Sequence, residues 1–200
     1  AILKHDHLIF DLDNFKIVYN DPRRFGYIDL TNQEPETHKF LSSLGPEPLS
    51  NYFNADDIAK TLFNRSKPIK NLLLDQNIVS GLGNIYVCEA LFRSKINPKK
   101  NCSKLVTSKG KPRKDLILLV QKINEVIKEA IEVGGSSLRD FSNINGKMGY
   151  FQSSFNVYNR ENEKCLLDCC DGVVKRIIQS GRSTFFCSKC QKNPLLIKFD

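Results

Sequence analysis

CLLDCC at residues 165–170 and CSKC at residues 187–190 are the stretches that decide the fold of the last third of this chain. Each cluster offers a pair of thiols, and this spacing suits one tetrahedral zinc ion held by four thiolates. About 35 residues bury too little apolar surface to fold alone, whereas a peptide zinc site contributes roughly 10–16 kcal/mol. Residues 173–186, between the clusters, have the pattern of two short strands that turn at Ser180-Gly181. The sequence therefore predicts a β-hairpin stabilised by zinc.

The first cluster leaves one ligand open, because Cys165 can pair with Cys169 or with Cys170 and both gaps lie in the common range. We favour Cys170. The alternative to zinc is a pair of disulfides, but the chain has seven cysteines, an odd number, and shows no signal-peptide pattern. Cys88 and Cys102 stand alone and are interpreted as ordinary, partly buried thiols. The predicted ligands of one structural zinc ion are Cys165, Cys170, Cys187 and Cys190.

Composition indicates the class of partner. The 200 residues include 30 Lys and Arg against 22 Asp and Glu, which gives a formal charge of +8. Aromatic residues make up 10%, so a core can form. The sequence has no apolar run of the roughly 18 residues that a membrane-spanning helix needs. A basic chain without such a run most often binds nucleic acid, because its cations release the counterions of the phosphates.

The hydrophobic pattern divides the chain into three parts. Residues 7–30 alternate with period two, which predicts a β-hairpin that turns at Asp13-Asn14, followed by an extended run over 27–30. From residue 37 the period is helical, and the long helix places Ile131 among its inward residues. The predicted helices cover residues 37–44, 55–64, 68–74, 85–92 and 112–133. The fold class is therefore α+β: a β segment, a four- or five-helix domain and the zinc hairpin.

Two loops carry groups that suit nucleic acid. The turn Gly81-Leu82-Gly83-Asn84 opens a helix whose first N–H groups could bind a phosphate, although a tight inter-helix turn explains it equally well. The loop of residues 20–26 holds Arg23 and Phe25, which could contact a base edge and wedge between bases. Its alternative is a solvated turn with Phe25 in the core. Arg182, beside the hairpin turn, is like Arg23 a guanidinium placed at a turn.

In their order along the chain, these residues resemble the bacterial formamidopyrimidine-DNA glycosylases, which excise oxidised purines. The similarity covers nearly the whole chain. The stretches that carry it are residues 5–7, 20–26, 44–49, Lys70 with Asp75, 81–86, 134–141, 146–151, 157–160 and the cysteine hairpin.

The resemblance implies a fold and a set of roles. Residues 1–36 would be the C-terminal part of a β-sandwich catalytic domain, residues 37–150 a helix–two-turns–helix domain, and residues 151–200 the zinc-finger hairpin. Asn84 and Lys70 would bind a phosphate, and Arg23 with Phe25 would fill the gap left by a flipped base. Arg182 would be the catalytic residue, donating a proton in the later elimination. The full set of implied DNA contacts is His5, Arg23, Phe25, Arg65, Lys70 and Asn84.

Some family features are absent from these 200 residues. The family reaction begins at an N-terminal proline beside a glutamate, with a lysine further on, and we expect the chain to be an N-terminally truncated form of such an enzyme. It would then bind damaged duplex DNA without cleaving it, while the complete parent would excise 8-oxoguanine and formamidopyrimidine and cleave the strand as a lyase. Lysine is usual in the family where Arg65 stands, proline where Met148 stands and glycine where Asn159 stands.

Two other interpretations stay open at this point. One is an endonuclease VIII-like enzyme acting on oxidised pyrimidines, and the other is a non-catalytic, zinc-dependent DNA-binding remnant. In each case we expect a monomer in the bacterial cytoplasm, associated with the nucleoid, without a membrane or a small-molecule cofactor.

Overall fold

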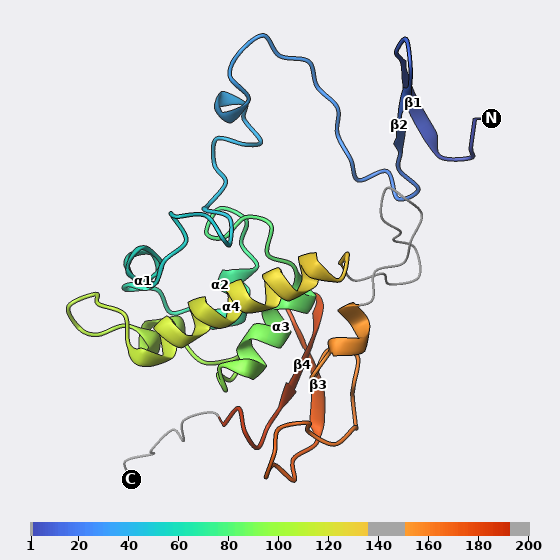
Figure 1. The fold of residues 1–200 in the computed structure, drawn as a ribbon. Coiled ribbons are helices and arrows are strands. Elements are labelled where there is room, and N and C mark those ends of the chain that lie inside the picture. The colour runs from blue at the N-terminus through green and yellow to red at the C-terminus, as the bar shows by residue number, and fades with distance from the viewer. Residues whose placement is uncertain (1, 136–150, 193–200) are drawn as a thin grey trace. The chain divides into compact units, whose positions relative to one another are not determined.

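The computed structural model describes residues 2–135 and 151–192, and it divides the chain into two compact units, Ala1–Ser42 and Ser43–Asp200 (Figure 1). Each unit is considered by itself below. Among the described residues, no helix has both the length and the apolar character that crossing a bilayer requires. The departure from the family at Met148, and residues 146–150 of the stretch that carries the resemblance, lie outside the described residues.

The first unit is built on the predicted hairpin. Strands β1 (Asp6–Asp11) and β2 (Lys16–Asn20) pair antiparallel, with Phe10 opposite Ile17. The alternating pattern is therefore confirmed here, but residues 27–30 form no strand. The helix predicted over 37–44 is wrong: one 3-10 turn, Pro35–Thr37, is all that forms, and Phe40 stays 54% exposed. A helix this short needs a core to pack on, and this unit offers none.

Over residues 43–135 and 151–192, the second unit contains four α-helices: α1 (Ala55–Leu62), α2 (Ile69–Leu73), α3 (Asn84–Arg93) and α4 (Lys114–Glu132). Each lies where the hydrophobic pattern predicted a helix. Asn54 caps α1 as expected, because its side-chain oxygen accepts the N–H of Asp57 at 3.0 Å. Pro68 precedes α2, where its missing N–H costs no helical hydrogen bond.

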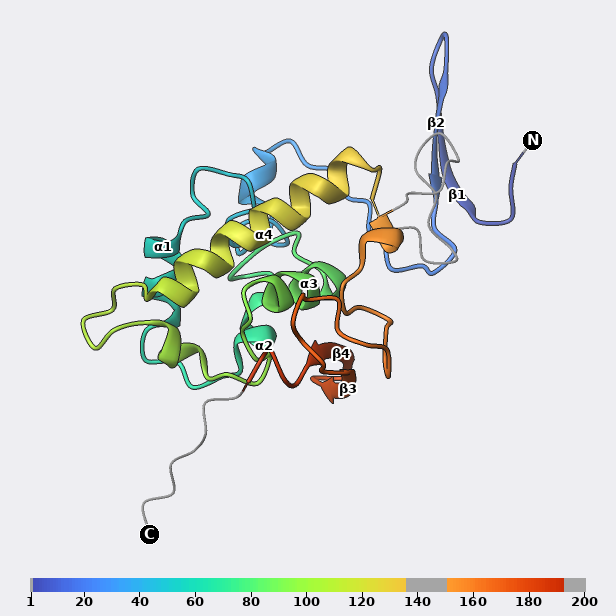
Figure 2. The ribbon, with the colours of Figure 1, turned by 60° about the horizontal axis from the view of Figure 1, so that its bottom comes forward.

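The four helices share one hydrophobic core. Helix α4 crosses α3, as both views show (Figures 1 and 2), and the guanidinium of Arg93 holds the Glu129 carboxylate through two hydrogen bonds of 2.6 and 2.7 Å. The inward face of α4 buries Leu116, Leu119, Val120, Ile123, Val126 and Ala130. Ile131, predicted to point inward, is 65% exposed although the adjacent Ala130 is 3% exposed, so the buried face of α4 is narrower at its end than the pattern predicted.

The remaining strands form the predicted C-terminal hairpin. Strand β3 (Val174–Gln179) pairs with β4 (Arg182–Cys187), and Gln179 lies opposite Arg182. The two turn residues, Ser180 and Gly181, have φ of 48° and 72°, which is the mark of a type I′ turn. The strands pack beside α3 over a second, smaller apolar cluster (Figures 1 and 2). Its buried members are Cys88, Phe92, Val157, Cys165, Val174, Phe185 and Cys187.

Neutral side-chain amides fasten this hairpin to the helical layer. Asn84 donates to the Ser183 carbonyl at 2.9 Å, and Asn71 donates to the Ser180 hydroxyl at 2.9 Å. At the other end, Asn97 donates to the Gln191 carbonyl while the Gln191 side chain donates to the Ile96 carbonyl, both at 2.8 Å. These partners lie between 94 and 109 residues apart in the chain.

A buried carboxylate joins α3 to the segment that leads into the hairpin. Glu89 has no exposed surface and accepts the backbone N–H groups of three consecutive residues, 156–158, at 2.9 Å each. The Asn156 side chain adds a fourth hydrogen bond at 3.0 Å. Because each of these donors would otherwise be buried unpaired, this one side chain lets an irregular segment cross the interior.

Candidate functional site

Four thiols meet beside the hairpin. The Sγ atoms of the four predicted ligands, Cys165, Cys170, Cys187 and Cys190, all lie within 4.8 Å of one another. Two of the sulfur pairs, Cys165–Cys190 and Cys170–Cys187, are 3.8 Å apart. A tetrahedral zinc with bonds of about 2.3 Å separates its sulfurs by about 3.8 Å, so the size of the cluster fits that ion. The four residues present can therefore hold a metal.

The structure separates the two candidates for the second ligand. Cys170 lies in the cluster, whereas Cys169 is exposed, has a φ of 61° and is not a member. The left-handed backbone at Cys169 lets the longer first cluster turn Cys170 toward the other three thiols. Cys88 and Cys102 lie elsewhere and are 1% and 0% exposed, so they are more fully buried than the sequence indicated.

The backbone around the thiols is held by neighbours that sequence reasoning missed. Gln191 has no exposed surface, accepts the N–H of Cys187 at 2.9 Å through Oε1, and donates its own N–H to the Cys187 carbonyl. Gly172 passes so close to the cluster that a Cβ there would lie 2.6 Å from the Cys187 sulfur. The only sequence signal for Gln191 was its place directly after the C-x-x-C pair.

A second group of predicted residues meets where α2, α3 and the hairpin turn adjoin. The Lys70 side chain is fully buried, and its Nζ has no hydrogen-bond partner among the described residues. Burial lowers the pKa of Lys70, and the positive charge of Arg182 lowers it further. The two basic side chains are therefore close enough for their charges to interact, which is an arrangement that an anion would stabilise.

Asn84 completes this group. It is the first residue of α3, whose N-cap Gly83 supplies no side-chain cap, so the first-turn N–H groups of a ten-residue helix are left for another partner. The turn before it needs glycine at Gly81, where φ is 72°. A Cβ at Gly81 or Gly83 would meet nothing within 4 Å, so space is open beside the turn. Lys70, Asn84 and Arg182 are the predicted residues that the structure brings together.

In the first unit, the loop after β2 displays an arginine and a phenylalanine. The Asp21 carboxylate accepts the N–H groups of Arg23, Arg24 and Gly26, and the Gly26 N–H is the main reason that the pKa of Asp21 is lowered. The guanidinium of Arg23 lies 4.7 Å from the ring centre of Phe25, and Phe25 is 78% exposed. Within this unit the interpretation of Phe25 as a core residue is therefore wrong.

Two predicted contacts stand apart from these groups. His5 is half-buried, and its carbonyl accepts the N–H of Asp21 at 3.0 Å. Arg65 is exposed on the loop after α1, and its carbonyl accepts the Cys102 thiol at 3.0 Å. Neither side chain contacts another predicted site residue within the described ranges.

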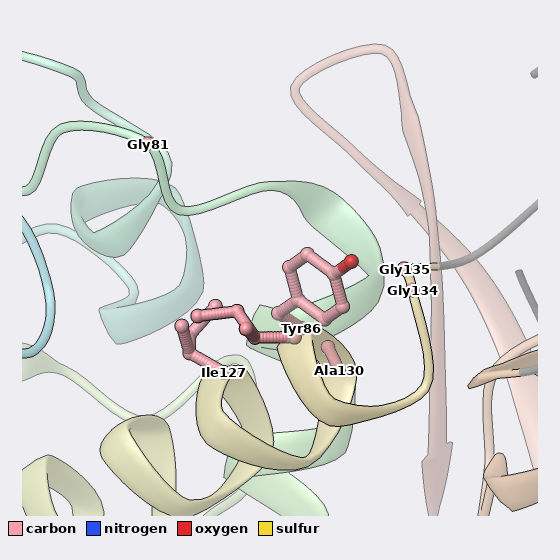
Figure 3. A pocket seen from close by; sticks show the side chains of 7 residues that line it. Gly81, Tyr86, Ile127, Ala130, Gly134 and Gly135 are labelled. Carbon is pink, nitrogen blue, oxygen red and sulfur yellow. The ribbon is translucent and has the colours of Figure 1, made fainter. Parts of the chain in front are cut away.

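An open apolar depression of about 410 Å³ lies where the Gly81 turn meets the end of α4 (Figure 3). Tyr86 forms one wall, and its hydroxyl is the polar atom that the close-up shows there. The other lining residues are Gly81, Ile127, Ala130, Ile131, Gly134 and Gly135. The sequence pattern predicted no apolar pocket here, and the lining holds no charged group.

Fold and site together define a helical module that carries a four-cysteine hairpin with the geometry of a metal site. Residues 44–142 match the domain family described as "Formamidopyrimidine-DNA glycosylase H2TH domain". The formamidopyrimidine-DNA glycosylase of Roseobacter denitrificans is 52% identical over 191 residues, which is 94% of this chain and 65% of that protein. The Rhizobium etli protein of the same name is 50% identical over 194 residues and is covered to 66%.

Solved structures agree with these relatives. The MutM (Fpg) protein of Thermus thermophilus superposes with a TM-score of 0.83 at 33% identity, covering 98% of this chain and 71% of that one. A Lactococcus lactis FPG mutant in complex with Fapy-dG-containing DNA gives 0.83 at 36% identity, covering 96% and 68%. This chain belongs to the formamidopyrimidine-DNA glycosylase family. It spans about 65% of the length of the first curated relative, and neither of the two alternative interpretations is favoured by these comparisons.

Proposed function

We propose that this chain supplies the damaged-DNA grip of a base-excision repair enzyme that removes oxidised purines and cleaves the strand. The observation that carries the proposal is the buried ammonium of Lys70, which has no partner in the described part of the chain and lies near Asn84 and the Arg182 guanidinium. Support comes from relatives that are named formamidopyrimidine-DNA glycosylases and from similar structures that hold DNA with Fapy-dG or carbocyclic 8-oxo-G.

The first step of the proposal is the binding of one backbone phosphate. Lys70 and Arg182 contribute positive charge, while Asn84 contributes the uncapped start of α3. The Nζ of Lys70 has no exposed surface, so contact requires a rearrangement of nearby side chains. The exposed Arg182 makes no side-chain hydrogen bond or ion pair within the described residues, which leaves its guanidinium available to an anion.

The second step is the readout of the lesion site. Arg23 and Phe25 occupy the space left by the flipped nucleotide, the ring against the neighbouring bases and the guanidinium toward the opposite one. The stacked pair on the Asp21-braced loop supports this role, because it is already ordered before DNA arrives. His5 and Arg65 add contacts to the backbone.

The third step concerns strand cleavage. The family resemblance implies a proton donor here, and we propose that Arg182 acts by donating a hydrogen bond, while keeping its proton, to the phosphate that leaves in the elimination. A guanidinium stays protonated at neutral pH, so it can hold the departing charge as a hydrogen-bond donor. The nucleophilic amine belongs to an N-terminal proline that these 200 residues do not contain, so this polypeptide alone is proposed to bind without cutting.

One zinc ion, when bound by the four clustered cysteines, stabilises the hairpin that carries Arg182. Gln191 and the close approach of Gly172 fix the thiols in place for it. The domain assignment follows the same proposal: residues 1–36 as part of a β-sandwich, 37–150 as the helix–two-turns–helix domain and 151–200 as the zinc finger, acting as a monomer.

Competition binding tests the proposal. The zinc-loaded chain is titrated against a duplex with a tetrahydrofuran abasic-site analogue, at about 50 mM and 200 mM salt, with the undamaged duplex as competitor. We expect tighter binding to the analogue and no nicking of abasic DNA. Equal affinity for both duplexes at low salt overturns the proposed grip, and nicking by the purified chain overturns the assignment of the nucleophile.

A further inference from the structure

We propose that Asn71 is a positioning residue for this phosphate site: by holding Ser180, it fixes the tip of the β3–β4 hairpin so that Arg182 stays beside Lys70. The inference rests on the proposed function, because Lys70 and Arg182 are its phosphate-binding pair. It adds a residue that neither the sequence pattern nor the family resemblance singled out.

The contact itself is direct. Asn71 follows Lys70 in α2, and its Nδ2 donates to the Ser180 hydroxyl at 2.9 Å, across 109 residues of chain. The Oδ1 of Asn71 is buried and has no partner among the described residues. One side chain thus links the residue next to the buried ammonium with the turn that precedes Arg182.

The turn has a reason to need such a contact. Ser180 adopts a left-handed backbone, with φ of 48°, which strains a residue that carries a Cβ. Its hydroxyl is the group that Asn71 holds, and Arg182 follows only two residues later at the start of β4. Two flanking hydrogen bonds hold the strands: Gln179 donates to the Pro98 carbonyl at 3.4 Å, and Asn84 donates to the Ser183 carbonyl. At the turn itself, the contact is the one from Asn71 to Ser180.

Electrostatics opposes the observed placement of the tip. The Arg182 charge lowers the pKa of Lys70, so the two cations repel each other across the junction. Before a phosphate is bound, this repulsion pushes the hairpin tip away from α2. An amide–hydroxyl hydrogen bond opposes that push without adding a carboxylate, which would compete with the phosphate for both cations.

A double-mutant cycle tests the inference on the zinc-loaded full chain. Dissociation constants for the tetrahydrofuran duplex are measured across a salt series for Asn71→Ala, Arg182→Ala and the double variant, with the exposed Asn51→Ala as matched control. We expect Asn71→Ala to weaken binding about threefold to tenfold and to reduce the salt slope by up to about 0.9, the value of one phosphate contact. The double variant should bind no more than about twofold worse than Arg182→Ala.

A second variant separates positioning from folding. Ser180→Gly removes the hydroxyl but relieves the left-handed strain, so the turn stays formed, and we expect it to weaken binding as Asn71→Ala does. Fully multiplicative effects in the cycle, or wild-type binding by Asn71→Ala or Ser180→Gly, overturn the inference. If the unsubstituted chain shows no preference for the abasic duplex, the proposed function fails. If the unsubstituted chain prefers the abasic duplex but Asn71→Ala binds it as well as the control Asn51→Ala does, this inference alone fails.

Discussion

Replacing Lys70 by methionine should make the protein more stable and a weaker DNA binder. The Lys70 side chain is 0% exposed and its ammonium has no partner among the described residues. A buried polar group without a hydrogen bond costs about 1–3 kcal/mol in protein mutational data. Methionine fills a similar unbranched space without a charge, so we expect the free energy of unfolding to rise by about 1–3 kcal/mol at pH 7.

The same substitution removes one cation from the phosphate site. A hydrogen bond to a charged group contributes about 1.5–3 kcal/mol, so the dissociation constant for abasic duplex should rise roughly 10- to 150-fold. Urea unfolding of the zinc-loaded chain and fluorescence anisotropy measure the two effects. Lys60→Met is the matched control, because Lys60 is 75% exposed in an ion pair with Asp57 and should leave both the urea midpoint and the dissociation constant nearly unchanged.

The pH dependence of the stability gain in Lys70→Met checks the direction of this effect. The pKa of Lys70 is lowered by burial, so the unfolded chain binds the lysine proton more tightly than the folded chain does. Burying the protonated amine therefore costs free energy of folding, and this cost is fully present below the lowered pKa. The penalty fades as the pH rises toward the ordinary lysine pKa of about 10.4, so the advantage of Lys70→Met should shrink there. A variant that loses stability at pH 7 while binding DNA normally would refute this reasoning.

Three further predictions follow from the other sites. Native mass spectrometry should find one bound zinc in Cys169→Ser and none in Cys170→Ser, because only Cys170 joins the thiol cluster; the opposite result would reassign the ligand. Glu89→Gln should lower the free energy of unfolding by about 1–3 kcal/mol, since the amide NH₂ meets buried N–H donors; urea denaturation measures the loss, and an unchanged midpoint would contradict it. Phe25→Ala should leave the free energy of unfolding within about 0.5 kcal/mol of the parent value, because Phe25 is 78% exposed, yet reduce the preference for abasic over intact duplex in competition assays; a preference equal to that of the parent would argue against the wedge role.

Local chemistry accounts for what the sequence predicted well. The C-terminal hairpin turns at Ser180-Gly181, and α1 begins at the Asn54 cap, as expected, because turn and cap preferences act within a few residues. The helix predicted over 37–44 failed because its apolar side chains find no core in their own unit. Burial decides such segments, and burial depends on distant parts of the chain.

The site shows the same division. Spacing indicated a four-thiol site and left Cys169 or Cys170 open as one ligand, with Cys170 favoured, and the structure gathers Cys170 with the other three. Asn71, Glu89 and Gln191 were missed because each acts on a backbone or side-chain atom that only the tertiary fold brings near, up to 109 residues away for Asn71. A lone Asn, Glu or Gln within a helix or after a cysteine carries no signal of such a partner.

The uncharged amides that join the hairpin to the helices make this junction insensitive to ionic strength. Asn84, Asn97 and Gln191 are neutral at every physiological pH, so salt does not screen their hydrogen bonds. DNA would be held mainly through cations, which salt does screen. Rising salt should therefore release the nucleic acid from a protein whose own architecture is still assembled and ready to bind again on dilution.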